Sequence, residues 1–211
     1  MISLRFLTIP LIALCCFTGE SHAQIADSKT HYRQSIKDWQ STMNSDFMGR
    51  KSPLTESGLK NFQGLPFFRI AKHWRLEAQW ERCDDSAWFG MPTSTDRLPM
   101  YRKYATLTMR HRGKTLVLIA YQSQSLMTKD GYEDHLFIPF ADASNGHTSY
   151  GGGRYIDINK DLAKSLWVID FNKSYNPYCA YSGRYSCPSI PSINRLHVAI
   201  GAGVKAPHTH D

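Results

Sequence analysis

The stretch YGGGRYIDI, residues 150–158, indicates the expected fold of this chain. Three consecutive glycines allow backbone angles with positive φ that other residues avoid, so residues 151–153 predict a tight corner or a close backbone approach. The residues after them alternate as in a β-strand, which places Tyr155 and Asp157 on one face and Arg154 with its apolar neighbours on the other. A phosphate-binding loop is excluded, because neither GxxxxGK[ST] nor a GxGxxG that opens a helix is present.

Similar strand signals recur along the chain on both sides of this stretch. Apolar and charged residues alternate over 74–81, as in a half-buried strand. The short connection at 111–113 predicts a hairpin and therefore an antiparallel sheet. We expect a mainly β fold, an antiparallel β-barrel or β-sandwich of about 8 strands, since an open sheet of that size would expose its edges. The remaining strand signals lie at 87–92, 100–109, 115–122, 136–140, 166–171 and 196–200.

One or two short N-terminal helices are expected to precede the strands. Asp27 or Ser28 can cap a first helix, in which Ile36, Trp39 and Met43 recur at helical spacing on one face. This apolar face predicts packing rather than a cofactor site. The sequence SPLT at 52–55 predicts the start of a second helix, because proline is tolerated in the first turn.

The N-terminal segment predicts export. An apolar run over 6–17 follows Arg5, and Ser-His-Ala at 21–23 offers a small-x-small cleavage site before Gln24. We expect residues 1–23 to be a cleaved secretory signal peptide and the protein to lie in the periplasm or outside the cell. Lipoprotein anchoring at the adjacent cysteines 15–16 is the less favoured alternative, because the preceding residues are not Gly or Ala.

The rest of the chain is expected to form one domain. Residues 24–203 are long enough for a single β-rich domain with a sizeable core, and residues 204–211 read as a flexible tail. No transmembrane segment is expected after signal cleavage, because the N-terminal apolar run is too short to span a bilayer and no other stretch qualifies.

The net charge of +7 would suit an anionic partner. The basic residues are spread along the chain, however, and the densest run, 110–114, reads as a hairpin tip. We therefore expect no nucleic-acid partner. Neither a cofactor nor a metal is expected, and the oligomeric state stays open.

Polar and aromatic residues gather in a second stretch, DFNKSYNPYCAYSGRYSCP at 170–188. Its start reads as a strand end, followed by a turn-rich loop. Together with 150–157 it supplies a planar guanidinium, carboxylates that could orient a ligand or act as acid and base, and tyrosines that could line a pocket. The alternative is structural, with an Arg154–Asp170 ion pair beneath an ordered loop. The candidate ligand-binding residues are Tyr150, Arg154, Tyr155, Asp157, Asp170, Asn172, Tyr175 and Asn176.

Three cysteines follow the predicted signal peptide. Cys179 and Cys187 bracket a short loop, and in an oxidising compartment they predict a local disulfide, which would contribute on the order of 2–3 kcal/mol. Cys83 is left over as a buried or a reactive thiol. A metal site that uses Cys179, Cys187 and a histidine is less favoured, because the closely spaced cysteine pairs of structural zinc sites are absent.

These motifs carry a family resemblance. YGGGRYID, DFNKSYNPYCAY and YSCP, with SPL and FQGLPFF upstream, resemble the bacterial and archaeal family called domain of unknown function 1684. The resemblance runs from about Trp39 to Gly203 and implies no established biochemical role. Family members tend to carry an acidic residue shortly before YGGGRY, where this chain has His147, Thr148 and Ser149.

Three functions are compatible with these patterns. The first, which we prefer, is a secreted or periplasmic domain that binds a small anionic or glycan-like ligand beside the glycine-rich corner. The second is a hydrolase-type enzyme that uses Asp or His residues of the same corner; it lacks a GxSxG nucleophile motif. The third is an envelope structural or interaction protein without a pocket.

Overall fold

The computed structural model describes residues 19–84 and 86–207. The chain forms two compact units, Met1–Ser35 and Ile36–Asp211, which divide within the first helix, α1 (Gly19–Met48). The described part of the first unit is helical throughout. Most of the predicted signal peptide lies outside the described residues. The sequence predicts a short first helix, but α1 has 30 residues.

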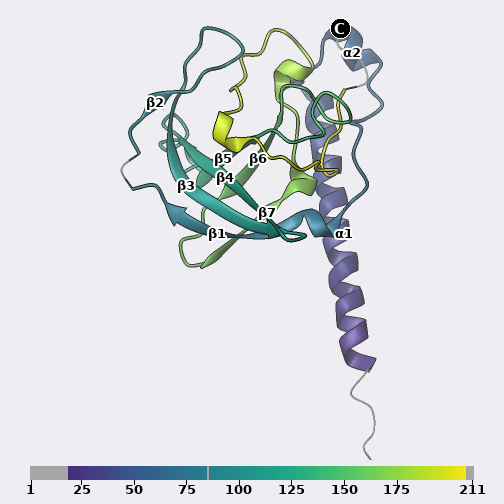
Figure 1. The fold of residues 1–211 in the computed structure, drawn as a ribbon. Helices are drawn as coiled ribbons and strands as arrows, with labels where there is room; N and C mark the ends of the chain where they lie inside the picture. The colour runs from purple at the N-terminus through teal and green to yellow at the C-terminus, as the bar shows by residue number, and fades with distance from the viewer. Residues whose placement is uncertain (1–18, 85, 208–211) are drawn as a thin grey trace, which may run out of the picture. The chain divides into compact units, whose positions relative to one another are not determined.

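The second unit contains the remaining elements (Figure 1). Helix α2 (Glu56–Lys60) begins after the predicted start at 52–55, so Pro53 precedes the helix rather than lying in its first turn. Its N-cap is Thr55, which accepts a hydrogen bond from the Gly58 backbone N–H at 3.0 Å. The strands are β1 (Arg75–Arg82), β2 (Phe89–Gly90), β3 (Met100–His111), β4 (Lys114–Ser123), β5 (His135–Phe140), β6 (Arg154–Asn159) and β7 (Leu166–Asp170). Four short 3-10 helices complete it: η1 (Lys72–Trp74), η2 (Phe171–Lys173), η3 (Tyr178–Ala180) and η4 (Ser192–Asn194).

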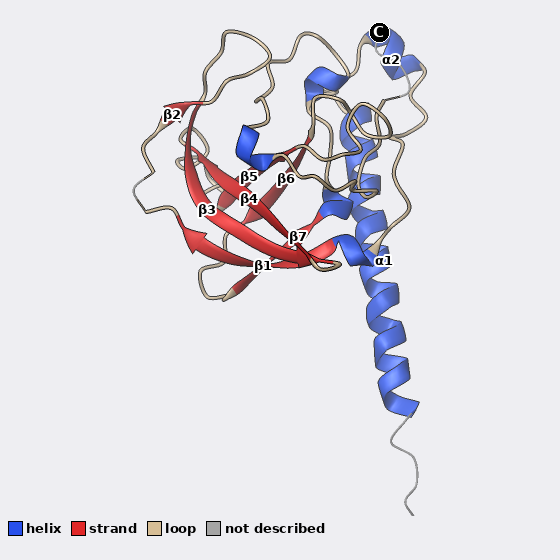
Figure 2. Ribbon diagram, viewed as in Figure 1, coloured by secondary structure: helices blue, strands red, loops and turns tan. Residues whose placement is uncertain are grey.

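The strands form one antiparallel sheet in the order β6-β5-β4-β3-β1-β7, and β2 pairs with β3. Figure 2 shows this sheet curving into a half-barrel. The mainly β antiparallel prediction is thus confirmed in its coarser form. The closed barrel or the sandwich of about 8 strands is not, since the sheet has 7 strands and the strand order ends at β6 and β7.

Two local predictions are confirmed within the sheet. The β3–β4 hairpin turns at Arg112 and Gly113, both with positive φ, as in a type I′ turn. On β1, Leu76 and Ala78 are buried, as the alternation predicts. These side chains join the main apolar cluster.

The strand expected at 196–200 is not formed. Its backbone instead follows residues 141–143: the Leu196 N–H donates to the Ala141 carbonyl at 2.8 Å, and the Ala143 N–H donates to the Val198 carbonyl at 3.0 Å. The Ile200 N–H is bonded to a side chain rather than to a neighbouring strand. A regular ladder therefore does not develop, and the segment is a packed connection.

The packed part of the chain also extends past the predicted boundary at 204. Val204 is fully buried, and its N–H donates to the Ser174 carbonyl at 2.9 Å. The Ala206 N–H donates to the Thr148 carbonyl at 3.1 Å. Residues 208–211 of the expected tail lie outside the described residues.

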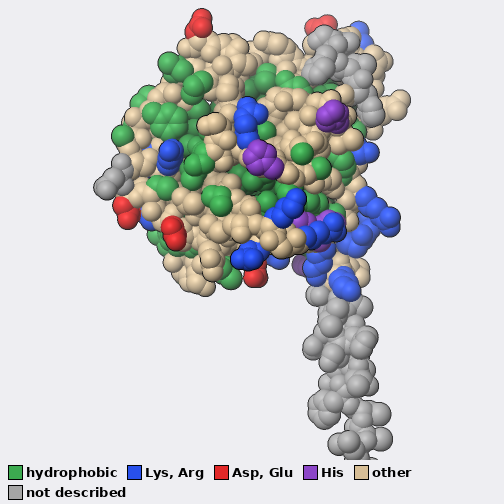
Figure 3. Space-filling model, in the orientation of Figure 1, with side chains coloured by type: hydrophobic (Ala, Val, Ile, Leu, Met, Phe, Trp, Pro, Cys, Tyr) green, Lys and Arg blue, Asp and Glu red, His purple; other side chains and the backbone are tan. Residues whose placement is uncertain are grey.

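On the face shown in Figure 3, several Lys and Arg side chains lie among polar and apolar ones, and acidic side chains are fewer. Within residues 19–84 and 86–207, no helix combines the length and the apolar character needed to cross a membrane.

Candidate functional site

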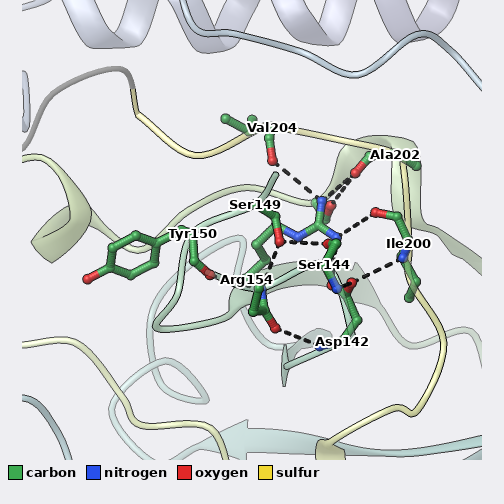
Figure 4. A network of polar contacts seen from close by, with 10 residues as sticks. Asp142, Ser144, Ser149, Tyr150, Arg154, Ile200, Ala202 and Val204 are labelled. Atoms are coloured by element: carbon green, nitrogen blue, oxygen red, sulfur yellow. Dashed lines mark hydrogen bonds and ion pairs between the residues drawn. The ribbon is translucent and has the colours of Figure 1, made fainter. Parts of the chain in front are cut away.

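The glycine-rich corner is built around the buried side chain of Arg154. Its Nη2 donates to Asp142 Oδ2 at 2.7 Å and to the Ile200 carbonyl at 2.9 Å. Its Nη1 donates to the carbonyl oxygens of Ala202 at 2.5 Å and Val204 at 3.4 Å (Figure 4). Burial lowers the pKa of Arg154, and the ion pair with Asp142 opposes this effect. The guanidinium therefore holds the C-terminal segment in place and does not face a cavity.

Asp142 is the acidic partner that the sequence did not identify. It lies 12 residues before Arg154, and both side chains are fully buried. Its Oδ1 also accepts the backbone N–H groups of Ser144, at 2.8 Å, and Ile200, at 3.0 Å. Ser149, one of the three residues that stand where the family resemblance implies an acidic side chain, is buried, and its hydroxyl is bonded to that of Ser144 at 2.7 Å. The Arg154–Asp170 pair that we considered is replaced by an Arg154–Asp142 pair.

Three other candidate residues satisfy backbone groups of the fold. Asp170 Oδ1 accepts the Asn172 N–H at 3.0 Å and starts η2. The Asn172 amide bonds both the N–H and the carbonyl of Ala71, at 2.8 and 2.9 Å. The Asn176 amide donates to the Lys205 carbonyl at 2.7 Å and to the Tyr181 hydroxyl at 3.0 Å. All three are buried, so their positions favour a structural role.

A pocket of about 620 Å³ lies on the other face of β6. Because neighbours on a strand point to opposite sides, Tyr155 and Asp157 face this pocket while Ile156 packs into the core. This division of β6 is the one the sequence predicts. Aromatic side chains are the commonest kind in its walls: Trp39, Tyr101, Tyr132, Phe137, Tyr155, Tyr175, Tyr178 and Tyr185.

Asp157 forms the polar centre of the pocket. It accepts a hydrogen bond from His135 Nε2 at 3.0 Å and another from the Tyr175 hydroxyl at 2.5 Å. His135 reaches it from the neighbouring strand, because β5 pairs His135 with Asn159 and therefore places Asp157 on the diagonal. Burial, and then the charge of Asp157, raise the pKa of Tyr175, which keeps this hydroxyl protonated as a donor.

The same contact places one proton on the histidine. A carboxylate only accepts, so Nε2 of His135 carries a proton, and Nδ1 is the ring nitrogen left outside this contact. That Nδ1 is buried, and no hydrogen-bond partner for it occurs among the described residues. His135 and Asp157 therefore form an ordered polar pair at the pocket wall.

Tyr150 lies apart from this pocket lining. Figure 4 shows its ring pointing away from the Arg154 guanidinium. Burial raises the pKa of Tyr150, as do the neighbouring Cys179 and Cys187. Both cysteines are free thiols, as is Cys83, so the predicted disulfide is not formed in the structure. The segments that carry the two thiols are nevertheless adjacent, as that prediction required.

Of the eight candidate residues, Tyr155, Asp157 and Tyr175 therefore line the pocket. Sequence reasoning missed His135 as a partner of Asp157, because the two meet only through the register of β5 and β6. The charged residues that line the cavity are Asp46, Asp157 and Lys173. Across the described ranges, no three His, Cys, Asp or Glu side chains gather as a metal site would require.

Comparison with known proteins adds a family but no activity. The sequence matches the family described as "Protein of unknown function (DUF1684)" over residues 60–205. No curated protein matches the chain. The structure is similar to the solution NMR structure of an uncharacterized protein of Haloarcula marismortui, with 29% sequence identity and a TM-score of 0.68. That similarity covers 87% of this chain and 99% of the other.

Proposed function

Because this chain belongs to a family of proteins of unknown function, DUF1684, we propose its function from the pocket itself: the protein binds a small glycan-like ligand. The observation that carries this proposal is Asp157, held by His135 and Tyr175 in the middle of an aromatic-lined cavity. Ligand sites typically combine such apolar walls with a few positioned polar groups.

Aromatic walls and a fixed carboxylate suit a sugar ring. The C–H faces of a sugar can pack on tyrosine and tryptophan rings, while its hydroxyls donate to a carboxylate in charge-assisted hydrogen bonds. An anionic ligand is less well matched, because Asp46 and Asp157 face the cavity against a single lysine, Lys173. Arg154, the residue on which the anionic alternative depended, is fully buried, and both of its terminal nitrogens are bonded inside the protein.

Substituting Asp157 by asparagine should weaken ligand binding about 10- to 100-fold, the loss expected for one charged hydrogen bond. The ligand class is first identified by native mass spectrometry of the protein purified from its own cells, in which a co-purifying mass is lost on denaturation. Calorimetric titration of the natural protein and of Asp157→Asn with neutral oligosaccharides of that class then measures the affinity.

The matched control is Asp84→Asn, which removes a carboxylate that is 83% exposed and does not line this pocket. Thermal unfolding of both variants separates a binding defect from a folding defect. Equal affinities of Asp157→Asn and Asp84→Asn for the ligand would contradict the proposal.

A hydrolase that uses the same polar pair is the second candidate function. Asp157 favours it, because a carboxylate oriented by His135 and Tyr175 at the pocket wall can take a proton from an attacking water. The binding proposal predicts that a bound oligosaccharide is recovered intact. The hydrolase predicts cleaved products, which would be lost in His135→Gln. A function without any pocket is disfavoured by the cavity itself.

We also propose that the protein is exported, on the basis of the apolar run at 6–17 and the Ala23 cleavage site. The intact mass of the protein recovered from the culture medium or the periplasm should correspond to a chain that starts at Gln24. A chain that keeps Met1 and stays with the cytoplasmic fraction would contradict export.

A further inference from the structure

Cys179 and Cys187 lie together at the two ends of one surface loop. The backbone N–H of Cys179 donates to the Sγ of Cys187 at 3.1 Å. The second cysteine is held from the other side as well, because its own N–H donates to Ser94 Oγ at 3.1 Å and its carbonyl accepts the Ser94 N–H at 2.9 Å. The two thiols are therefore neighbours on backbone that is tied in place.

The two thiols differ in access. Cys187 is 8% exposed, in an apolar cluster at the edge of the pocket, whereas Cys179 packs against the same cluster and is only partly buried. Where a more accessible thiol lies beside a buried one, the first reacts faster with reagents in solution and the second is placed to react with its neighbour.

The pKa values of the two thiols are also shifted in opposite directions. A hydrogen bond from the Cys187 thiol is the main cause that lowers the pKa of Cys179 to about 6, and the hydroxyls of Tyr150 and Ser94 contribute further. The same contact, with burial next, raises the pKa of Cys187. The Cys179 sulfur is therefore the one that exists as a thiolate near neutral pH.

We propose that Cys179 and Cys187 form a redox-active dithiol that exchanges with disulfides of low-molecular-weight thiols. The Cys179 thiolate attacks one sulfur of the disulfide RSSR, the S–S bond breaks, and one thiolate leaves and takes up a proton. Cys187 then loses its proton and attacks the Cys179 sulfur, which expels the second thiol. The protein dithiol is oxidised by two electrons, and RSSR is reduced to two RSH.

This role differs from that of a permanent structural disulfide. The reduced pair has its own hydrogen bonds, and stabilisation of the reduced form makes the disulfide easier to reduce. Cys83 provides the internal comparison, because its Sγ lies 3.7 Å from Thr106 Oγ1 rather than beside one of the other two thiols.

The test is the reaction of the reduced full-length protein with excess glutathione disulfide, followed by intact mass spectrometry. The natural protein should lose two hydrogens between Cys179 and Cys187, and excess reduced glutathione should restore them. Cys187→Ser should instead stop at a glutathione adduct on Cys179. Cys179→Ser should form an adduct on Cys187 at least about tenfold more slowly, because that thiol is buried and protonated. Cys83→Ser should behave as the natural protein does at this pair.

Equal rates of adduct formation at the two sites would overturn the proposal, as would a disulfide that resists reduced glutathione. A measurement without substitutions guards against misfolded variants. When the reduced natural protein is treated with limiting iodoacetamide and mapped by peptide mass, Cys179 should be alkylated before Cys187. Alkylation of Cys187 first would equally overturn the assignment.

Discussion

Replacing Asp142 by asparagine is expected to lower the free energy of unfolding by about 3–5 kcal/mol, the loss seen when one partner of a buried ion pair is removed. Three donors converge on the Asp142 carboxylate, namely Arg154 on one oxygen and the N–H groups of Ser144 and Ile200 on the other. An asparagine amide has one acceptor oxygen, so its NH₂ group would face a donor in either orientation. The Arg154 charge would also remain buried without a counter-ion.

Urea unfolding followed by tryptophan fluorescence measures this loss. The matched control is Asp161→Asn, because Asp161 pairs with Lys164 at a similar distance, 2.8 Å, but on the exposed surface. That variant should leave the unfolding midpoint almost unchanged. If the two variants unfolded at the same urea concentration, the anchoring role of Arg154 and Asp142 would be wrong.

Substituting Gly153 by alanine is expected to cost about 2–5 kcal/mol, the sum of backbone strain and overpacking. The residue has a φ of 89°, which L-residues with a side chain rarely adopt. An added Cβ would lie 2.5 Å from Ile190 Cγ1 and 2.8 Å from the Phe140 carbonyl oxygen. The carbonyl belongs to β5 and cannot move away without disturbing the sheet.

Gly183→Ala is the matched control, because an added Cβ there would meet open space among the described residues and no positive φ is involved. Thermal unfolding of the two alanine variants should show a large loss for Gly153 and almost none for Gly183. A Gly153→Ala protein as stable as the control would show that the corner does not require glycine.

Sequence pattern alone specified the local features of this protein. The alternation after the three glycines correctly placed Tyr155 and Asp157 opposite Ile156, because the period of a strand depends only on its own backbone. The hairpin at Arg112 and Gly113 and the family assignment likewise came from short stretches of sequence.

The tertiary structure decided which distant groups meet. Arg154 pairs with Asp142 rather than with Asp170. His135 of β5 forms a hydrogen bond with Asp157 of the neighbouring strand β6. The sheet is an open half-barrel whose strand order ends at β6 and β7. Residues 196–200 make only a few backbone hydrogen bonds with residues 141–143 and add no strand to the sheet. Each outcome depends on register and on the path of loops far apart in the chain, which periodicity within one segment cannot encode. The glycine-rich corner was therefore correctly singled out, but its arginine anchors the fold while the opposite face of the same strand forms the pocket.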